Sequence, residues 1–287
     1  MRKSVYQFLL DWAACKGHHN VVKLLLNKEE IEVNKIANKF GWTPLFLAVV
    51  YDHEKIVSLL LAKEGIKINE ADQEDGQTPL HWASYNGNHK MVKLLLSMEE
   101  IKVNQINNIY GETPLMMASK EGYHEIVNLF LEREDIQVNI CDKRGWSPIN
   151  YVSYKGYHEI VNSLLQNQGV QVNLANEYGE TPLDLAVYYG YDKVAKLLLR
   201  KEDIQVNKAN EYGETPLFKA AEKGHDKVVK LLLKKEGIEV NRADNVGATP
   251  ISVAADERHG KIVDLLLGTD EIRAVGWNGW RPNAAPA

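Results

Sequence analysis

The histidines are the first residues of this chain to test for chemistry, because imidazole binds metals and moves protons. Eight of the nine follow a predicted turn between two short helices: His18, His19, His53, His89, His124, His158, His225 and His259. Ligands of one zinc ion must converge to within about 4 Å of one another. Helices stacked side by side lie about 8–10 Å apart. One histidine per helix pair cannot converge in this way, so we expect no metal site and predict that these rings hydrogen-bond to backbone.

The other chemistry-bearing residues form no catalytic arrangement either. Cys15 and Cys141 stand far apart without a CxxC spacing, which favours a reducing, intracellular setting. Glutamates such as Glu29, Glu64 and Glu99 recur where one predicted helix pair ends and the next begins, as expected of a solvated edge. The sequence has no Ser/His/Asp arrangement, no glycine-rich phosphate loop and no HExxH motif. We therefore expect no catalytic residues, no cofactor and no enzymatic activity.

The charge balance excludes two broad classes of partner. The chain has 287 residues with 34 Lys and Arg against 39 Asp and Glu, a formal net charge of −5, and the two signs are interspersed. Phosphate binding needs a concentrated basic face, so we expect no nucleic-acid binding. No apolar run reaches the roughly 18 residues that a spanning helix needs. We expect no membrane insertion and a cytoplasmic location.

A tripeptide of the type Thr-Pro-Leu recurs along the chain at steps of 34 or 35 residues, each copy two residues after a glycine. The copies begin at Thr43, Thr78, Thr113, Ser147, Thr181, Thr215 and Thr249. The hydroxyl residue can cap a helix and the proline suits the first helical position, so each copy predicts a helix start. A second glycine, such as Gly87 or Gly190, predicts a turn into a second, apolar helix. Val-Asn then precedes a predicted β-hairpin finger.

These motifs resemble the ankyrin repeat, and the resemblance covers nearly the whole chain. It implies an all-α repeat solenoid of helix-turn-helix units with β-hairpin fingers, stacked in a curve with a concave groove. We predict a single ankyrin-repeat domain over 1–287. Its expected parts are an N-terminal capping repeat at 1–39, six internal repeats at 40–248, a truncated last repeat at 249–268, and an irregular tail at 269–287. In that tail, Trp277 and Trp280 either seal the last repeat or begin another.

The resemblance also implies a role: a non-catalytic module that binds a partner protein or peptide on its concave face. In this family the partner-facing positions flank the finger glycine and end the first helix. Aromatic residues are frequent there, as at protein interfaces. The predicted partner-binding residues are Phe40, Trp42, Tyr51, Tyr85, Tyr110, Glu112, Arg144, Trp146, Tyr154, Tyr178, Tyr188, Tyr189 and Tyr212. Packing of finger on finger is the alternative for Tyr178 and Tyr212, and core packing is expected for Trp82 and Tyr151.

Several alternatives stay open on the sequence alone. The chain could be a free-standing adaptor, which we expect to be a monomer, the recognition arm of a larger multidomain protein, or a microbial effector acting on host proteins. The asparagines of Val-Asn resemble substrates of an asparaginyl hydroxylase, but capping of a turn explains them as well. A partner carrying both aromatic and basic residues would suit the mixed charges of the predicted surface.

Overall fold

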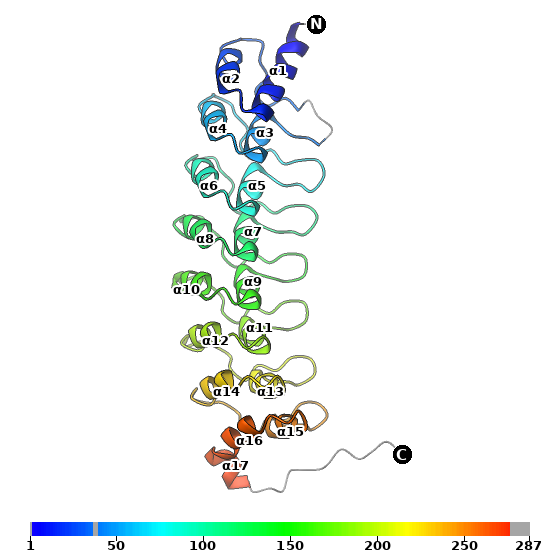
Figure 1. Ribbon diagram of the computed structural model, residues 1–287, viewed down its shortest axis with the longest axis vertical. Coiled ribbons are helices and arrows are strands. Elements are labelled where there is room, and N and C mark those ends of the chain that lie inside the picture. The colour runs from blue at the N-terminus through cyan, green and yellow to red at the C-terminus, as the bar shows by residue number, and fades with distance from the viewer. Residues whose placement is uncertain (1, 37–39, 276–287) are drawn as a thin grey trace, which may run out of the picture. The chain divides into compact units, whose positions relative to one another are not determined.

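A computed structural model describes residues 2–36 and 40–275, which divide into two compact units, Met1–Arg144 and Gly145–Ala287. All regular structure in these described residues is helical (Figure 1). The helices of the first unit are α1 (Arg2–Lys16), α2 (His19–Leu25), α3 (Pro44–Val50), α4 (Glu54–Leu61), α5 (Pro79–Tyr85), α6 (His89–Leu96), α7 (Pro114–Glu121) and α8 (His124–Leu131). Those of the second are α9 (Pro148–Lys155), α10 (His158–Gln166), α11 (Pro182–Tyr188), α12 (Asp192–Leu198), α13 (Pro216–Glu222), α14 (Asp226–Leu232), α15 (Pro250–Asp256), α16 (Gly260–Leu267) and α17 (Asp270–Val275).

The predicted helix starts are confirmed at all seven Thr-Pro-Leu copies, each of which places its proline first in a helix. At α3 the Phe46 amide donates to the Thr43 hydroxyl at 3.2 Å, which satisfies an otherwise unpaired helix N–H. At α11 the cap is reciprocal, because the Thr181 amide also donates to the Asp184 carboxylate at 2.9 Å. The hydroxyl and the proline therefore fix where the first helix begins in these seven repeats.

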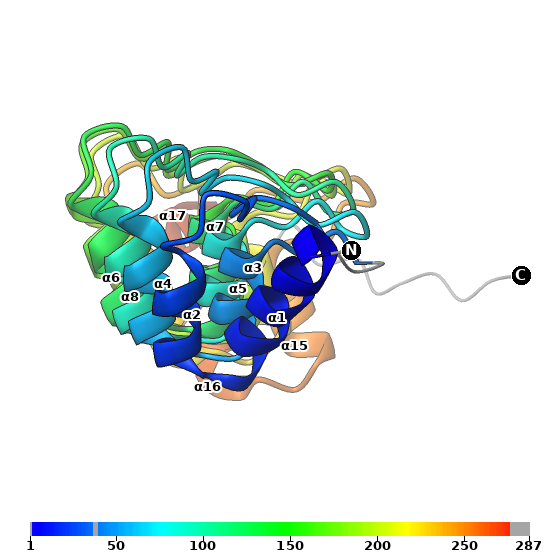
Figure 2. The ribbon, with the colours of Figure 1, turned by 90° about the horizontal axis from the view of Figure 1, so that it is seen from above.

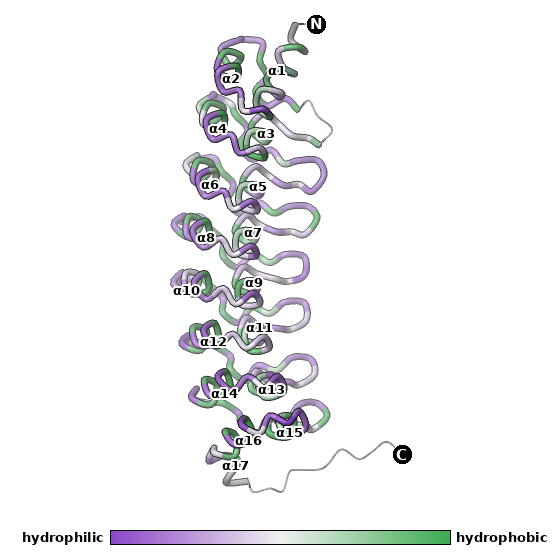
Figure 3. The backbone as a smooth tube through the Cα atoms, viewed as in Figure 1, coloured by the Kyte–Doolittle hydropathy of each residue, from purple (hydrophilic) through white to green (hydrophobic). Residues whose placement is uncertain are grey.

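Within each unit the helices form two layers. In the first unit α3, α5 and α7 stack in one layer and α2, α4, α6 and α8 in the other, with the loops along one edge (Figures 1 and 2). In the second unit α9, α11, α13 and α15 face α10, α12, α14 and α16 in the same way. Hydrophobic residues gather where the layers meet (Figure 3), and side chains such as Leu80, Phe130 and Leu198 are fully buried there. Each helix pair thus buries its apolar faces between the layers and against its neighbours.

The fingers differ from the predicted β-hairpins, because no β-strand is assigned anywhere in residues 2–36 and 40–275. The turn at Gly76 shows the physical reason. Its arms are joined by the Asp72 amide donating to the Gln77 carbonyl at 2.8 Å. The Asp75 and Gly76 amides donate to Asp72 Oδ1 at 2.8 and 2.9 Å, and the Gln73 amide donates to the Phe40 carbonyl of the preceding finger at 3.0 Å. Hydrogen bonds to the Asp72 side chain thus take the place of backbone bonds that a β-hairpin would form between its strands.

Five asparagines of the Val-Asn motifs bond to the next repeat, which turn capping alone did not predict. Asn173 donates from Nδ2 to the Asp203 carbonyl at 2.7 Å and accepts at Oδ1 from the Gln205 amide at 2.9 Å. The same pair of bonds occurs at Asn34, Asn69, Asn104 and Asn207. These amides therefore hold the backbones of consecutive repeats together.

At the two ends, α1 leaves Val5, Phe8 and Trp12 exposed, and α17 follows the last repeat. Trp277 and Trp280 lie outside the described residues. The proposed domain boundaries therefore stay predictions. No helix in the described part of the chain is long and apolar enough to cross a membrane.

Candidate protein-interaction surface

In the first unit the predicted aromatic residues divide into exposed and packed ones. Tyr51, Tyr85 and Tyr110 are about half exposed, at 48%, 51% and 56%. Phe40 and Trp42 are instead partly covered, with 5.0 Å between their ring centroids. Trp42 also stacks on the buried ring of Phe46 at 5.5 Å and meets Trp82 edge-on at 6.0 Å. The structure therefore uses Trp42 partly for packing between repeats, together with Trp82.

Glu112 is a correction to the expected exposed surface, since only 4% of it is accessible. Its Oε1 accepts from Lys120 Nζ at 2.9 Å, and its amide donates to Asn107 Oδ1 at 3.1 Å. Lys120 also covers the Tyr110 ring, with Nζ 6.0 Å from the centroid. The lysine of α7 thus reaches over the finger and closes Glu112 off, so Glu112 is left out of the surface proposed below.

In the second unit four predicted residues come together in a continuous aromatic row. The rings of Trp146 and Tyr154 meet edge-on with 5.4 Å between their centroids. The centroid distances are 5.0 Å from Tyr154 to Tyr189 and 4.9 Å from Tyr189 to Tyr188. Tyr151 is buried beside Trp146, as expected of a core residue. Partial burial, followed by the hydrogen bond with Tyr154, raises the pKa of Tyr189 to about 12, so this hydroxyl stays neutral at physiological pH. Tyr189 therefore presents a polar tip without charge.

The two finger tyrosines of this unit are exposed, Tyr178 at 56% and Tyr212 at 63%. Their backbone amides each donate to the asparagine two residues earlier, Asn176 and Asn210, at 3.0 Å. These bonds fix the tips of the two turns and leave the rings accessible. Arg144, at the tip of the preceding finger, is also exposed, and its Nε lies 3.9 Å from Asp142.

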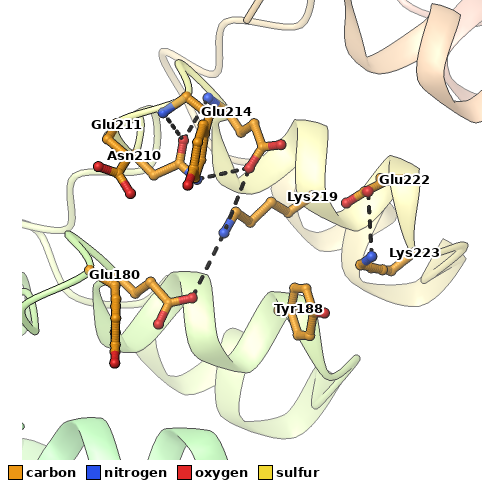
Figure 4. A pocket seen from close by; sticks show the side chains of 10 residues that line it. Glu180, Tyr188, Asn210, Glu211, Glu214, Lys219, Glu222 and Lys223 are labelled. Carbon is orange, nitrogen blue, oxygen red and sulfur yellow. Dashed lines mark hydrogen bonds and ion pairs between the residues drawn. The ribbon is translucent and has the colours of Figure 1, made fainter.

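A cleft of about 400 Å³ lies between the fingers and first helices of the two repeats that carry Tyr178 and Tyr212 (Figure 4). Its lining residues are Tyr178, Glu180, Tyr188, Asn210, Glu211, Tyr212, Glu214, Lys219, Glu222 and Lys223. It thus unites three of the predicted residues, Tyr178, Tyr188 and Tyr212. Lys223 lies over the Tyr188 ring at 4.9 Å and pairs with Glu222 at 3.4 Å.

Lys219 belongs to the mixed charges of the predicted surface, but the structure buries it in this cleft. It comes from α13, is only 6% exposed, and lies between Glu180 and Glu214 (Figure 4). Its Nζ is 3.9 Å from Glu180 Oε1 and 3.9 Å from Glu214 Oε2. A signal for this burial was present, because the same position of the other Thr-Pro-Leu repeats is apolar: Leu47, Trp82, Met117, Tyr151, Leu185 and Val253.

Three of the histidines that follow the inter-helix turns make the backbone hydrogen bonds that the sequence predicted, whereas His124 Nε2 accepts from the Asn128 side chain at 3.3 Å. Nε2 of His53, His225 and His259 donates to the carbonyls of Cys15, Tyr188 and Glu222 at 2.9–3.0 Å. Each of these carbonyls belongs to the first helix of the preceding repeat or to its end. Within residues 2–36 and 40–275, no three His, Cys, Asp or Glu side chains come close enough to hold a metal ion.

The stacked helix pairs and their capped starts define a helical repeat protein, and comparison with known proteins identifies the family. A family model described as ankyrin repeats, in three copies, matches residues 4–72, 65–142, 134–210 and 202–274. The chain therefore belongs to the ankyrin-repeat family, whose members generally act as protein-interaction modules.

A solved structure supports the same fold. The crystal structure of EF0377, an ankyrin repeat protein, has a TM-score of 0.63 with this chain and is 26% identical to it. The match covers 67% of this chain and 97% of that one. No curated protein matches the sequence.

Proposed function

We propose that this protein is a non-catalytic interaction module that docks a partner protein on the finger and first-helix side of its second unit. The observation that carries the proposal is the row of Trp146, Tyr154, Tyr189 and Tyr188, which continues into the cleft beside Tyr178 and Tyr212. Tyrosine and tryptophan are the commonest anchors of protein interfaces, since they give large contact areas and have few torsions to restrict.

The contacts of the tyrosines favour a rigid docking surface. Tyr188 and Tyr189 remain 38% and 42% exposed although each is held by a neighbouring ring. A side chain that is already ordered loses little entropy when a partner binds. We also propose that Tyr51, Tyr85 and Tyr110, the exposed tyrosines of the first unit, contact a partner. We further propose that the protein acts as a monomeric adaptor in the cytoplasm.

The test removes the ring contacts and measures partner capture. The triple variant with Tyr154→Ala, Tyr188→Ala and Tyr189→Ala should retain at least tenfold less of the proteins that the wild type captures from its native cells, because buried interface tyrosines carry much of the binding energy. The control replaces the exposed Phe8 and Trp12 of α1 by alanine.

Quantitative mass spectrometry of the retained proteins provides the readout, and circular dichroism checks that the variants keep their helices. Unchanged capture by the triple variant, with an unchanged helical spectrum, would overturn the proposal. Equal losses in the triple variant and in the α1 control would also contradict it.

A further inference from the structure

Two successive fingers of the second unit have identical sequences. Residues 175–183 and 209–217 both read Ala-Asn-Glu-Tyr-Gly-Glu-Thr-Pro-Leu. Their bonds are duplicated too: Asn176 Nδ2 donates to Glu180 Oε2 at 3.0 Å, and Asn210 Nδ2 donates to Glu214 Oε2 at 2.8 Å. In each finger one carboxylate oxygen is thus held by the turn. The pair presents the same tyrosine and glutamate twice, one repeat apart.

The cleft between these fingers carries a net negative charge. Glu180, Glu211, Glu214 and Glu222 line it against only two ammonium groups, those of Lys219 and Lys223. Its walls are the rings of Tyr178, Tyr188 and Tyr212. Aromatic faces and carboxylates both attract cations, more strongly where water is partly excluded.

Lys219 shows that these groups hold a cation in this protein. Its ammonium lies 3.9 Å from each of Glu180 and Glu214 and 5.8 Å from the centroid of the Tyr188 ring (Figure 4). This lysine stands where the other Thr-Pro-Leu repeats place an apolar side chain. Packing alone therefore does not require a charge at this position, and a cation-binding environment surrounds it.

We propose, building on the function proposed above, that this cleft docks an extended segment of a partner protein through basic side chains. Arginine or lysine side chains of the segment lie against Tyr178 and Tyr212 and pair with the glutamates that line the cleft. Packed helices are about 8–10 Å apart, and three residues of a polyproline II helix span about 9 Å. An extended segment with a basic residue at every third position thus matches the one-repeat spacing of the two fingers.

The experiment uses the whole chain and defined peptides. The probe is a fluorescein-labelled peptide of four Arg-Pro-Pro units, which is extended and basic, and the comparison peptide has four Glu-Pro-Pro units. Fluorescence anisotropy at low ionic strength gives each Kd. The basic peptide should bind at least tenfold more tightly than the acidic one, and rising salt should weaken its binding.

Two cleft variants make the proposal falsifiable. Glu180→Gln with Glu214→Gln should weaken binding of the basic peptide about tenfold. The fold accepts this change, because Gln77 stands at the same position of another finger. The matched control is Glu202→Gln with Glu236→Gln, an equally spaced pair of exposed carboxylates at repeat boundaries, which should leave Kd unchanged.

Lys219→Leu should change the affinity for the basic peptide in the opposite direction. Leu47 and Leu185 stand at this position in other repeats, so the variant should fold. Removing the competing charge should tighten binding of the basic peptide, on the order of fivefold. Weaker binding by Lys219→Leu would overturn the proposal, as would stronger binding of the acidic peptide or no binding of the basic one.

Failure of this proposal can be distinguished from failure of the proposed function. If the tyrosine triple variant loses partner capture while the variant with Glu180→Gln and Glu214→Gln keeps it, the docking role stands and the basic partner class is wrong. If the tyrosine variant captures as the wild type does, the docking role itself is wrong.

Discussion

The ring of His225 lies directly against Gly190. A Cβ atom on Gly190 would stand 2.6 Å from His225 Nδ1, and the backbone there has φ +72°. His225 also donates to the Tyr188 carbonyl at 3.0 Å, so its ring cannot easily move away. The glycine that ends the first helix is therefore required both by the left-handed turn and by the histidine of the next repeat.

We expect Gly190→Ala to destabilise the protein by at least about 2 kcal/mol, since the left-handed conformation costs a non-glycine residue about 1 kcal/mol before any clash. The control is Gly179→Ala, which has φ +74° but no atom within 4 Å of the added Cβ. It should cost only about 1 kcal/mol. Urea denaturation followed by circular dichroism measures both, and equal losses would show that the His225 contact is unimportant.

The asparagine bridges between repeats lead to a second prediction. Asn173→Ala removes both the bond to the Asp203 carbonyl and the bond from the Gln205 amide. Both lie near solvent, so we expect a loss of about 1–2 kcal/mol in the free energy of unfolding. Asn173→Asp keeps an acceptor for Gln205 but sets a carboxylate against the Asp203 carbonyl, and it should cost at least as much at pH 7. A fully stable Asn173→Ala variant, measured by urea denaturation, would contradict the bridging role.

Much of the fold was predictable because its signals are local. The Thr-Pro pairs specify helix starts through capping and a fixed φ, and these act over three or four residues. The turns were less predictable, since Asp52 and Arg258 adopt φ of 59° and 61° where the other repeats have glycine. There the packing of the two helices imposes a conformation that the residue itself disfavours. The bridging role of Asn173 depends on an atom 30 residues away, which no local pattern contains.

The candidate surface was predictable in position but not in detail. The repeat pattern places Tyr178, Tyr188 and Tyr212 at exposed positions, and the structure exposes them. The repeat pattern cannot show that Lys120, eight residues later, covers Glu112, because this contact depends on the direction of a flexible side chain. The burial of Lys219 was not predicted, because this residue was counted among the exposed charges, although comparing the repeats position by position reveals one charge among apolar residues.

His81 provides a prediction about acid sensitivity. It is fully buried, its Nδ1 accepts from the Thr78 amide at 3.1 Å, and its Nε2 donates to the Glu112 carbonyl at 3.1 Å. Burial lowers the pKa of His81 from 6.5 to about 4. The unfolded chain then binds the proton more readily than the native one, so stability falls as the pH drops from about 6.5 toward 4.

We expect His81→Asn to reduce this loss, because Asn150 stands at the same position in α9 and makes the same cap. Between pH 7.5 and 4.5 the wild type should lose about 2 kcal/mol more stability than the variant, in urea denaturation at both pH values. His19→Asn, at an exposed position, is the control and should behave as the wild type. An equal loss of stability in the wild type and in His81→Asn would show that His81 does not cause the acid sensitivity.

Asp184 should show the opposite dependence on pH. Its Oδ2 accepts from the Thr181 amide and hydroxyl, at 2.9 and 2.6 Å, while Oδ1 is buried without a hydrogen-bond partner. Burial raises the pKa of Asp184 from 3.8 to about 6 against the opposing effect of the Thr181 bonds. The native state then binds the proton more readily than the unfolded chain. The contribution of Asp184 to the stability of the fold is therefore fully present below about pH 3.8 and is lost as the pH rises through about 6.

Asp184→Asn should therefore stabilise the protein by about 2 kcal/mol at pH 7.5, and the gain should shrink toward zero near pH 4. The reciprocal change provides the control. Asn150 donates from Nδ2 to the Leu174 carbonyl at 3.0 Å, so Asn150→Asp sets a carboxylate oxygen against that carbonyl and should destabilise increasingly as the pH rises. Urea denaturation of both variants at pH 7.5 and 4.5 measures the effect. A gain from Asp184→Asn that is equal at the two pH values would mean that the ionisation of Asp184 has no part in it.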